Sequence, residues 1–387
     1  MVMLDIDSFA QNLLDIEKLA VGLNGIYMKK LEQAEMAHAD EYESPEHPPQ
    51  DIVVFNELRS CADLYRLVDT EQLEIQPYFQ REDVWSDADQ TRFIDSLVKQ
   101  LPIPSLCLGF DFQMRKWIVI DGLQRMTAMI RFLAPDSKWV LSNLKDIDKS
   151  LAGVSVAALR KPESPLRMHF ERVENMTLPI TVIRCNFKDY THTEYLFKIF
   201  HRLNAGGMKL TNQEIRNCIY SGPFNKLLRE LDTTPEWVSI KSYVTGKKDR
   251  FRAVELILRM FAFLEDRVSY GSNLPRFLNG YMQKNRFANQ AKMDGYSNVF
   301  IGTTATILNM GGIVLADRRL GFSQIEALLI GVATNLDAVK NMTADDFVLR
   351  INKFMNIGSL SSEELRNDIS SKERVNRRIE DSIAVFS

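Results

Sequence analysis

The chain contains few cysteines and no long uncharged apolar run. Its cysteines are Cys61, Cys107, Cys185 and Cys218, and none forms a CxxC pair. Such wide spacing argues against zinc ribbons and disulfide scaffolds and favours buried free thiols. Because no stretch of about 18 uncharged apolar residues occurs, we expect no transmembrane helix and no membrane partner. Acidic residues interrupt the first apolar stretch, so no signal peptide is predicted and the expected location is the cytoplasm.

An excess of charge of either sign is also absent. The 387 residues include 48 Lys and Arg against 51 Asp and Glu, and the net charge is −3. This balance excludes a global basic field for nucleic acid, although a local patch could still bind DNA. The best local candidates are GKKDRFR at 246–252 and SSKERVNRRIED at 370–381, where interleaved acids equally fit a solvated helix face.

Several familiar catalytic patterns are missing. The five histidines form neither HExxH nor a His/Cys metal spacing, and the chain has no Walker-type P-loop or GxSxG elbow. A covalent nucleophile is therefore not supported.

Apolar residues make up 45% of the chain, which is enough for two packed domains. Residues 1–50 are expected to form an amphipathic helix and a proline-rich linker; the helix packs either on the body of the protein or on a partner subunit. Residues 51–190 mix strand and helix signals, and residues 191–387 have helical periodicity. The predicted fold class is α+β, with a small mixed-sheet domain followed by an α-helical domain.

Capping, turn and periodicity signals predict the elements of the mixed domain. Ser86 and Asp89 indicate a capped helix over 84–100. A second helix is expected at 123–133. Strands are expected at the end of 69–77, at 178–184, and in a hairpin formed by 105–110 and 117–120.

In the helical region, Ser or Thr followed three residues later by Glu predicts four helix starts. The pairs are Thr191 with Glu194, Thr211 with Glu214, Ser323 with Glu326, and Ser361 with Glu364. The stretch 252–266 is apolar nearly all round, so we expect a buried central helix there.

The stretch WIVIDGLQR at 117–125 ends a predicted strand and opens a predicted helix. The first N–H groups of such a helix lack backbone partners, and the helix dipole favours an anion such as phosphate. Gly122 permits a tight turn, and Arg125 offers a guanidinium fork. Gln124 could bond a base, a sugar or an attacking water, and Asp121 could ligate Mg²⁺, bond a ribose or act as a base. The alternative is an Asp-Gly turn with Arg125 in a surface salt bridge.

Two further stretches could contribute to the same site. PYFQREDVW at 77–85 carries Gln80 and Arg81, which could hold a phosphate from a second side. FHRLNAGGMKLTNQEIRN at 200–217 carries Asn204 and Lys209, and we include both in the predicted phosphate-binding set. The alternatives are core aromatics with Arg81 paired to a neighbouring acid, and a simple helix hairpin.

Five stretches together resemble the N-terminal domain of GmrSD-type restriction enzymes. They are YFQREDVW, IDSL (94–97), LPIP (101–104), IDGLQRMTAM (120–129) and FHRLNAGGMKLTNQEIRNCIY (200–220). The similarity covers about 55–270, with the motifs in the family's order. It implies a ParB/sulfiredoxin-like fold and a role in bacterial anti-phage defence, with nucleoside triphosphate binding and hydrolysis that control DNA cleavage.

The family signature Asp-Gly-Gln-Gln-Arg corresponds to Asp121, Gly122, Gln124 and Arg125, with Leu123 in place of the first Gln. The resemblance thus implies that Asp121, Gln124 and Arg125 are catalytic residues. It also implies that nucleotide binding is retained even if Leu123, in place of Gln, removes hydrolysis. No His-Asn-His nuclease set is visible, so we expect a partner effector or nuclease subunit.

Three readings remain open. The first is a nucleotide-binding defence protein, with or without hydrolysis, that regulates action on DNA. The second is a non-enzymatic DNA- or protein-binding module with a vestigial nucleotide pocket. The third is a nuclease with a metal site at Asp121 and another acid such as Asp95 or Glu82. The nucleotide, the partner and the oligomeric state, including a homo-oligomer, are left open.

Overall fold

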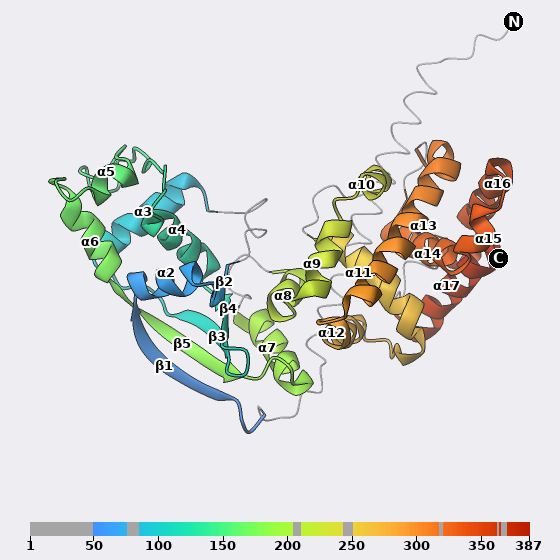
Figure 1. Ribbon diagram of the computed structural model, residues 1–387, viewed down its shortest axis with the longest axis horizontal. Helices are drawn as coiled ribbons and strands as arrows, with labels where there is room; N and C mark the ends of the chain where they lie inside the picture. The colour runs from blue at the N-terminus through green and yellow to red at the C-terminus, as the bar shows by residue number, and fades with distance from the viewer. Residues whose placement is uncertain are drawn as a thin grey trace, which may run out of the picture. The chain divides into compact units, whose positions relative to one another are not determined.

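The computed structural model describes residues 49–75, 85–203, 210–242, 251–316, 320–361, 364 and 370–387. The chain divides into two compact units. The first, the sheet unit, is Ser44–Ile219; the second, the helical unit, joins Tyr220–Ser387 with Met1–Glu43. The predicted leading helix lies outside the described residues. We expected the helical domain to begin at residue 191, and the unit that contains the sheet extends to Ile219 (Figure 1).

The sheet unit is built on a five-stranded mixed sheet with the strand order β1-β5-β3-β4-β2. The strands are β1 (Val53–Ser60), β2 (Leu73–Glu74), β3 (Leu106–Asp111), β4 (Lys116–Asp121) and β5 (Thr177–Cys185). β1 pairs antiparallel with β5, and β3 pairs antiparallel with β4. The pairs β3–β5 and β2–β4 are parallel.

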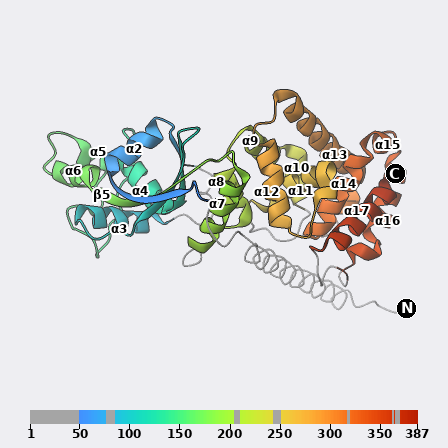
Figure 2. The ribbon, with the colours of Figure 1, turned by 90° about the horizontal axis from the view of Figure 1, so that it is seen from below.

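Helices cover both faces of this sheet. Five helices gather on one side: α2 (Cys61–Asp69), α3 (Asp87–Val98), α4 (Leu123–Leu133), α5 (Val156–Arg160) and α6 (Arg167–Asn175) (Figures 1 and 2). Trp117 and Val119 of β4 belong to the core beneath them. The alternate residues Ile118 and Ile120 are also buried, and α7 (Tyr190–Leu203) and α8 (Asn212–Ile219) pack against β4. Successive side chains of β4 point to opposite faces of the sheet, so this strand contributes to an apolar layer on each face.

The predicted elements around the motif are confirmed. The helix over 123–133 coincides with α4, and the hairpin is the antiparallel pair of β3 and β4. Ser86 is the N-cap of α3, where its hydroxyl accepts from Asp89 N–H at 3.2 Å and donates to the Asp89 carboxylate at 2.6 Å. The pair Thr211 and Glu214 likewise caps α8.

Two predicted helix starts are wrong. α7 begins at Tyr190, and Asp189 Oδ1 accepts from the N–H and hydroxyl of Thr191, so Thr191 lies inside the helix. α14 (Phe322–Thr334) begins after Gly321, whose N–H donates to Gln324 Oε1 at 2.8 Å. Glu326, expected at that cap, is instead buried among other helices. In both cases the cap lies two residues earlier than the predicted one.

In its described part, the helical unit consists mainly of α-helices, which 3₁₀ turns and loops connect. Its helices are α9 (Pro223–Leu231), α10 (Pro235–Lys241), α11 (Arg252–Asp266), α12 (Leu274–Asn285), α13 (Gln290–Ala316), α14, α15 (Leu336–Lys340), α16 (Ala344–Met355) and α17 (Lys372–Phe386). The predicted central helix is confirmed, because α11 is buried along most of its length (Figure 2). None of the helices in the described residues is long and apolar enough to span a membrane.

Candidate functional site

The passage from β4 to α4 is a tight turn at Gly122. Its φ is 93°, which lies in the left-handed region that disfavours every residue with a Cβ. Its carbonyl accepts from Met126 N–H at 2.9 Å. A Cβ at this position would also lie 2.2 Å from Leu106 Cδ2 and 3.0 Å from Arg125 Nη2. Both the backbone angle and the surrounding space therefore require glycine.

The N-terminus of α4 has no side-chain cap from the described residues. In a helix, the N–H groups of the first turn have no intrahelical acceptor and carry the positive end of the dipole. In α4 this turn runs from Leu123, directly after Asp121 and Gly122. The turn therefore has the backbone features of an anion site.

Arg125 binds several protein acceptors around this turn. Its Nη2 donates to Asp121 Oδ2 at 2.8 Å, and its Nη1 donates to the carbonyl of Pro104. Both nitrogens also lie 3.4 Å from the carbonyl oxygen of Ser105. The Arg125 side chain is only 14% exposed. Burial lowers the pKa of Arg125, and the Asp121 carboxylate opposes that shift. Arg125 therefore forms a salt bridge, as the alternative reading expected, but from a largely buried position and with carbonyl acceptors besides Asp121.

Gln124 holds the chain that leads into α3. Its Oε1 accepts from the backbone N–H of Trp85 at 3.2 Å. The carbonyl of Trp85 accepts from Gln90 Nε2 at 3.0 Å. Trp85 is the first described residue after the stretch 76–84, which contains the predicted Gln80 and Arg81. Gln124 thus connects the turn at Gly122 to Trp85, which follows the second predicted motif.

The structure brings four of the predicted site residues together. These are Asp121, Gly122, Gln124 and Arg125. The other residues named from the sequence lie outside the described residues: Gln80, Arg81, Glu82, Asn204 and Lys209. Their placement in the site stays a prediction.

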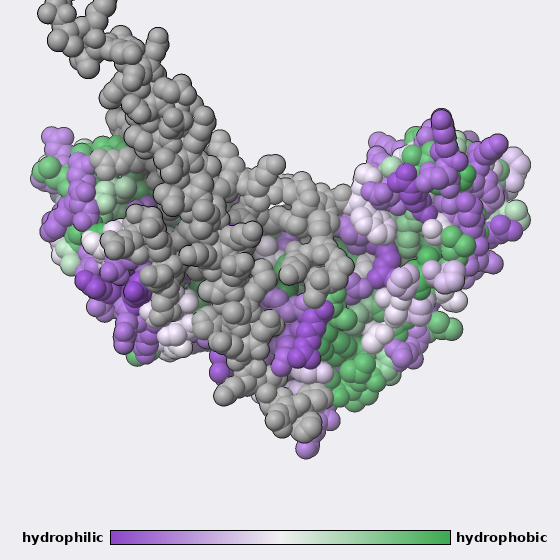
Figure 3. All heavy atoms as spheres, turned by 180° about the vertical axis from the view of Figure 1, so that it is seen from behind, coloured by the Kyte–Doolittle hydropathy of each residue, from purple (hydrophilic) through white to green (hydrophobic). Residues whose placement is uncertain are grey.

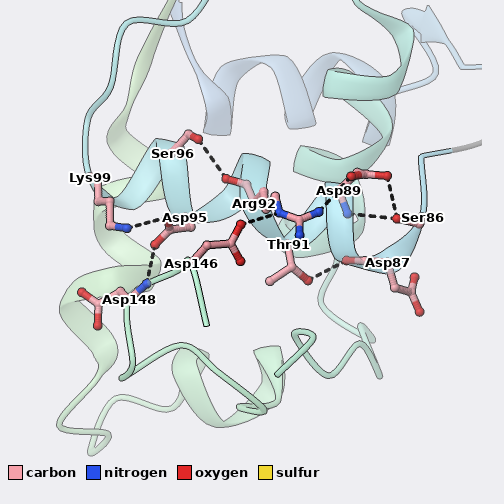
Figure 4. A network of polar contacts seen from close by, with 10 residues as sticks. All are labelled: Ser86, Asp87, Asp89, Thr91, Arg92, Asp95, Ser96, Lys99, Asp146 and Asp148. Atoms are coloured by element: carbon pink, nitrogen blue, oxygen red, sulfur yellow. Dashed lines mark hydrogen bonds and ion pairs between the residues drawn. The ribbon is translucent and has the colours of Figure 1, made fainter. Parts of the chain in front are cut away.

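Asp95, suggested as a second metal ligand, is occupied by structural contacts on α3. Its Oδ1 accepts from Asp148 N–H at 2.9 Å, and its Oδ2 pairs with Lys99 at 2.7 Å (Figure 4). Thr91, one turn earlier, accepts from Ser142 N–H at 3.0 Å. These contacts fasten α3 to the loop that contains residues 142–148. Within the described residues, no group of three His, Cys, Asp or Glu side chains could hold a metal ion.

Sequence reasoning missed Arg131, which fixes the other end of the α3–α4 contact. Its Nη1 donates to Asp87 Oδ1 at 2.5 Å and to Gln90 Oε1 at 3.0 Å. Its guanidinium also lies 4.4 Å from the ring centroid of Trp139. These partners are 8 to 44 residues away along the chain, so no local pattern could have indicated them.

Asp121 differs from Arg125 in being accessible, with 38% of its side chain exposed. The neighbouring thiol of Cys107 is inert by contrast, because burial and the charge of Asp121 raise its pKa to about 12. A surface depression of ≈ 390 Å³ occurs elsewhere in the sheet unit, between Gln100 and α6, and contains none of the motif residues. The accessible chemistry at the turn is therefore one carboxylate beside an uncapped helix.

The sheet unit is thus a mixed sheet whose hairpin leads through Asp-Gly into a helix that carries Gln124 and Arg125. Residues 64–221 match the family model described as GmrSD restriction endonuclease, N-terminal domain, and are therefore such a domain. The resemblance is thus confirmed over 64–221, a shorter span than the expected 55–270. No curated protein and no solved structure matches the chain.

Proposed function

We propose that the sheet unit binds a nucleoside triphosphate at the turn formed by Asp121, Gly122, Gln124 and Arg125. The observation that carries this proposal is the uncapped N-terminus of α4, reached through a left-handed Gly122 and flanked by an accessible carboxylate. The family match supports a role in restriction. Nucleotide binding would regulate action on DNA, by this chain or through a partner effector or nuclease.

The proposal gives each side chain of the turn a role. A phosphate oxygen at the helix N-terminus would compete with Asp121 for the Arg125 guanidinium. The released carboxylate could then share a Mg²⁺ ion with the phosphate, since Mg²⁺ prefers one or two carboxylates plus phosphate oxygens. Gln80, Arg81, Asn204 and Lys209 would complete the phosphate contacts.

We propose that binding outweighs turnover at this site. Leu123 has no polar group with which to orient a water. The Oε1 of Gln124 is already bonded to Trp85 N–H, so it would have to leave that bond to act on a water. Hydrolysis, if the site retains it, would use Asp121, Gln124 and Arg125 as the reacting set.

The second candidate is a non-enzymatic DNA- or protein-binding module. The observation in its favour is that Arg125 already has protein acceptors for both terminal nitrogens. The basic stretches give it less support. Arg378, in the 370–381 stretch, is buried and pairs with Glu326 at 2.9 Å. Residues 246–250 of the other stretch lie outside the described residues.

The deciding experiment is a thermal-shift screen of the full chain with ATP, GTP, CTP and UTP, each with Mg²⁺. A ligand that binds the native state at 100 times its Kd adds about 2.7 kcal/mol of stability and raises the Tm. Arg125→Ala should weaken binding roughly 10- to 100-fold, because a charged hydrogen bond contributes about 1.5–3 kcal/mol. Asp136→Asn, at an exposed position of the same unit, is the control. A Tm that no nucleotide changes would favour the second candidate.

A further inference from the structure

The outer edge of β1 is long and hydrophobic. β1 pairs with β5 on one side and forms the end of the sheet on the other. Four of its large apolar side chains are exposed: Val53 (44%), Val54 (54%), Phe55 (39%) and Leu58 (71%). In the view from behind, hydrophobic surface gathers over the part of the sheet unit where β1 and β5 lie (Figure 3). An exposed strand edge of this kind is a template for pairing with another chain.

Several of the devices that usually block such pairing are absent from β1, and its two charged side chains, Glu57 and Arg59, pair with each other at 2.5 Å. The strand VVFNELRS has no proline or lysine, and its register with β5 runs without a bulge from Val53 to Ser60. The opposite edge of the sheet is protected differently, because β2 has only two residues. The contrast indicates that the β1 edge is suited to a partner strand.

The two faces of β1 are distinct. Phe55 lies opposite Val182, a member of the core under the helices. By alternation, Val54, Asn56 and Leu58 lie on the other face. There Asn56 Oδ1 accepts from the Thr181 hydroxyl at 2.9 Å. The exposed pattern on this face is therefore an amide flanked symmetrically by two apolar side chains.

We propose that β1 pairs antiparallel with β1 of a second copy of this chain, about a two-fold axis at Asn56. Directly opposite residues of an antiparallel pair share a face, so the axis must pass through a residue rather than between two. Only an axis at Asn56 or Glu57 pairs seven of the eight strand residues. An axis at Glu57 places two glutamates opposite each other, which is unfavourable. An axis at Asn56 places Val54 of each copy opposite Leu58 of the other, so two such apolar pairs form.

This interface is self-complementary, as a closed dimer requires. The two outer amides meet at the axis, and the apolar pairs flank them on the same face. The two sheets become one continuous sheet, and the exposed backbone groups of both edges find partners. The proposal is independent of nucleotide binding.

The first test compares Leu58→Lys with Val268→Lys in the full chain by size-exclusion chromatography with light scattering. The wild-type chain should have twice the 44.5 kDa chain mass. Leu58→Lys should be monomeric with an unchanged circular dichroism spectrum, because the side chain is 71% exposed and its loss leaves the fold intact. Val268, 88% exposed in the helical unit, should tolerate lysine without losing the dimer. A monomeric wild-type protein, or a Leu58→Lys dimer, would overturn the proposal.

The second test fixes the register with Asn56→Cys. The four native cysteines are buried, so the new thiol is the accessible one. Diamide, a mild oxidant, removes the two thiol hydrogens, is itself reduced to the hydrazine, and leaves an interchain disulfide. Across the axis the two Cβ atoms would lie about 4.5–5.5 Å apart. A small approach of the two strands brings them to the roughly 3.5–4.5 Å of a disulfide, so a crosslinked dimer should form. Leu349→Cys, exposed on α16, should stay uncrosslinked. A dimer whose Asn56→Cys variant does not crosslink would exclude the axis at Asn56.

Discussion

The two compact units place a charged pair in opposite surroundings. In the sheet unit, Asp121 meets Arg125 at the turn and keeps 38% of its side chain exposed. In the helical unit, Glu326 is fully buried against Arg259 and Arg378. An accessible carboxylate can exchange its partner for a ligand at small cost, whereas a buried one is costly to uncouple. Accessibility therefore separates a candidate site from a structural network of similar chemistry.

The buried network joins three helices with balanced charge. Arg259 Nε donates to Glu255 Oε1 at 2.9 Å, and Arg259 Nη1 lies 3.4 Å from Glu326 Oε2. Arg378 Nη2 donates to Glu326 Oε1 at 2.9 Å. Two guanidinium groups and two carboxylates thus hold α11, α14 and α17 together, and Glu326 bonds both cations.

The largest effect should follow removal of that shared carboxylate. Glu326→Ala leaves Arg259 and Arg378 without it in a buried site, and the free energy of unfolding should fall by about 3–5 kcal/mol. Urea denaturation followed by circular dichroism measures the loss. Glu373→Ala, at an exposed position of α17, should change it by less than about 0.5 kcal/mol. Similar values for the two variants would show that the buried network around Glu326 is not a structural one.

A smaller but substantial loss is expected at the turn of the sheet unit. In Gly122→Ala, the left-handed φ should lower the free energy of unfolding by about 1–2 kcal/mol. The overlap of the new Cβ with Leu106 should lower it by about 1–3 kcal/mol more. Gly153→Ala is the matched control, because its φ is +72° and nothing lies within 4 Å of the added Cβ. The difference between the two melting curves isolates the overlap. If Gly153→Ala destabilises as much, packing at the turn is not critical.

The next largest loss of stability is expected from a substitution at the contact between α14 and α17. A Cβ on Gly331 would lie 2.3 Å from Ser382 Oγ and 3.0 Å from the Ser382 carbonyl. Gly331→Ala should therefore cost about 1–3 kcal/mol. Gly295→Ala, exposed in α13 with nothing nearby, should instead add about 0.5–1 kcal/mol through helix propensity. Opposite signs in thermal denaturation would confirm this; a stabilised Gly331→Ala would contradict it.

The smallest stability effect is expected where function is proposed. Asp121→Asn should alter the unfolding free energy by less than about 1 kcal/mol, because the pair is partly exposed and Arg125 keeps its carbonyl acceptors. If Asp121 shares a Mg²⁺ ion with the nucleotide, as proposed, the nucleotide-dependent rise in Tm should nevertheless be lost. A large destabilisation would instead make Asp121 a structural residue like Glu326.

Prediction from the sequence succeeds for local features of the fold and fails for features that depend on contacts between distant residues. The extent of α4, the β3–β4 hairpin and the caps at Ser86 and Thr211 follow from residues within one turn or loop. β1 was not predicted, since exposed apolar residues on both faces of an edge strand remove the alternation that marks a strand. The cap of α7 was misplaced because Asp189 and Thr191 are both good capping residues.

The candidate site shows the same division. The position of Gly122 and the open helix N-terminus follow from the strand-turn-helix pattern. The contacts of Arg125 with the carbonyls of Pro104 and Ser105 do not, because they join residues about twenty positions apart through the sheet. Charge and spacing identify a cation near the turn, but only the fold determines which acceptors it binds.

A continuous chain of polar contacts runs from that turn to the edge of the sheet. Arg125 contacts the carbonyl of Ser105, the Ser105 hydroxyl lies 3.2 Å from the Thr181 hydroxyl, and Thr181 donates to Asn56. Thermodynamic linkage makes any coupling along it reciprocal. For each nucleotide bound, the factor by which it changes the dimerisation constant must equal the factor by which dimerisation changes the affinity of that nucleotide. Nucleotide binding and dimerisation are separate proposals, but one coupling factor can be measured from either of them.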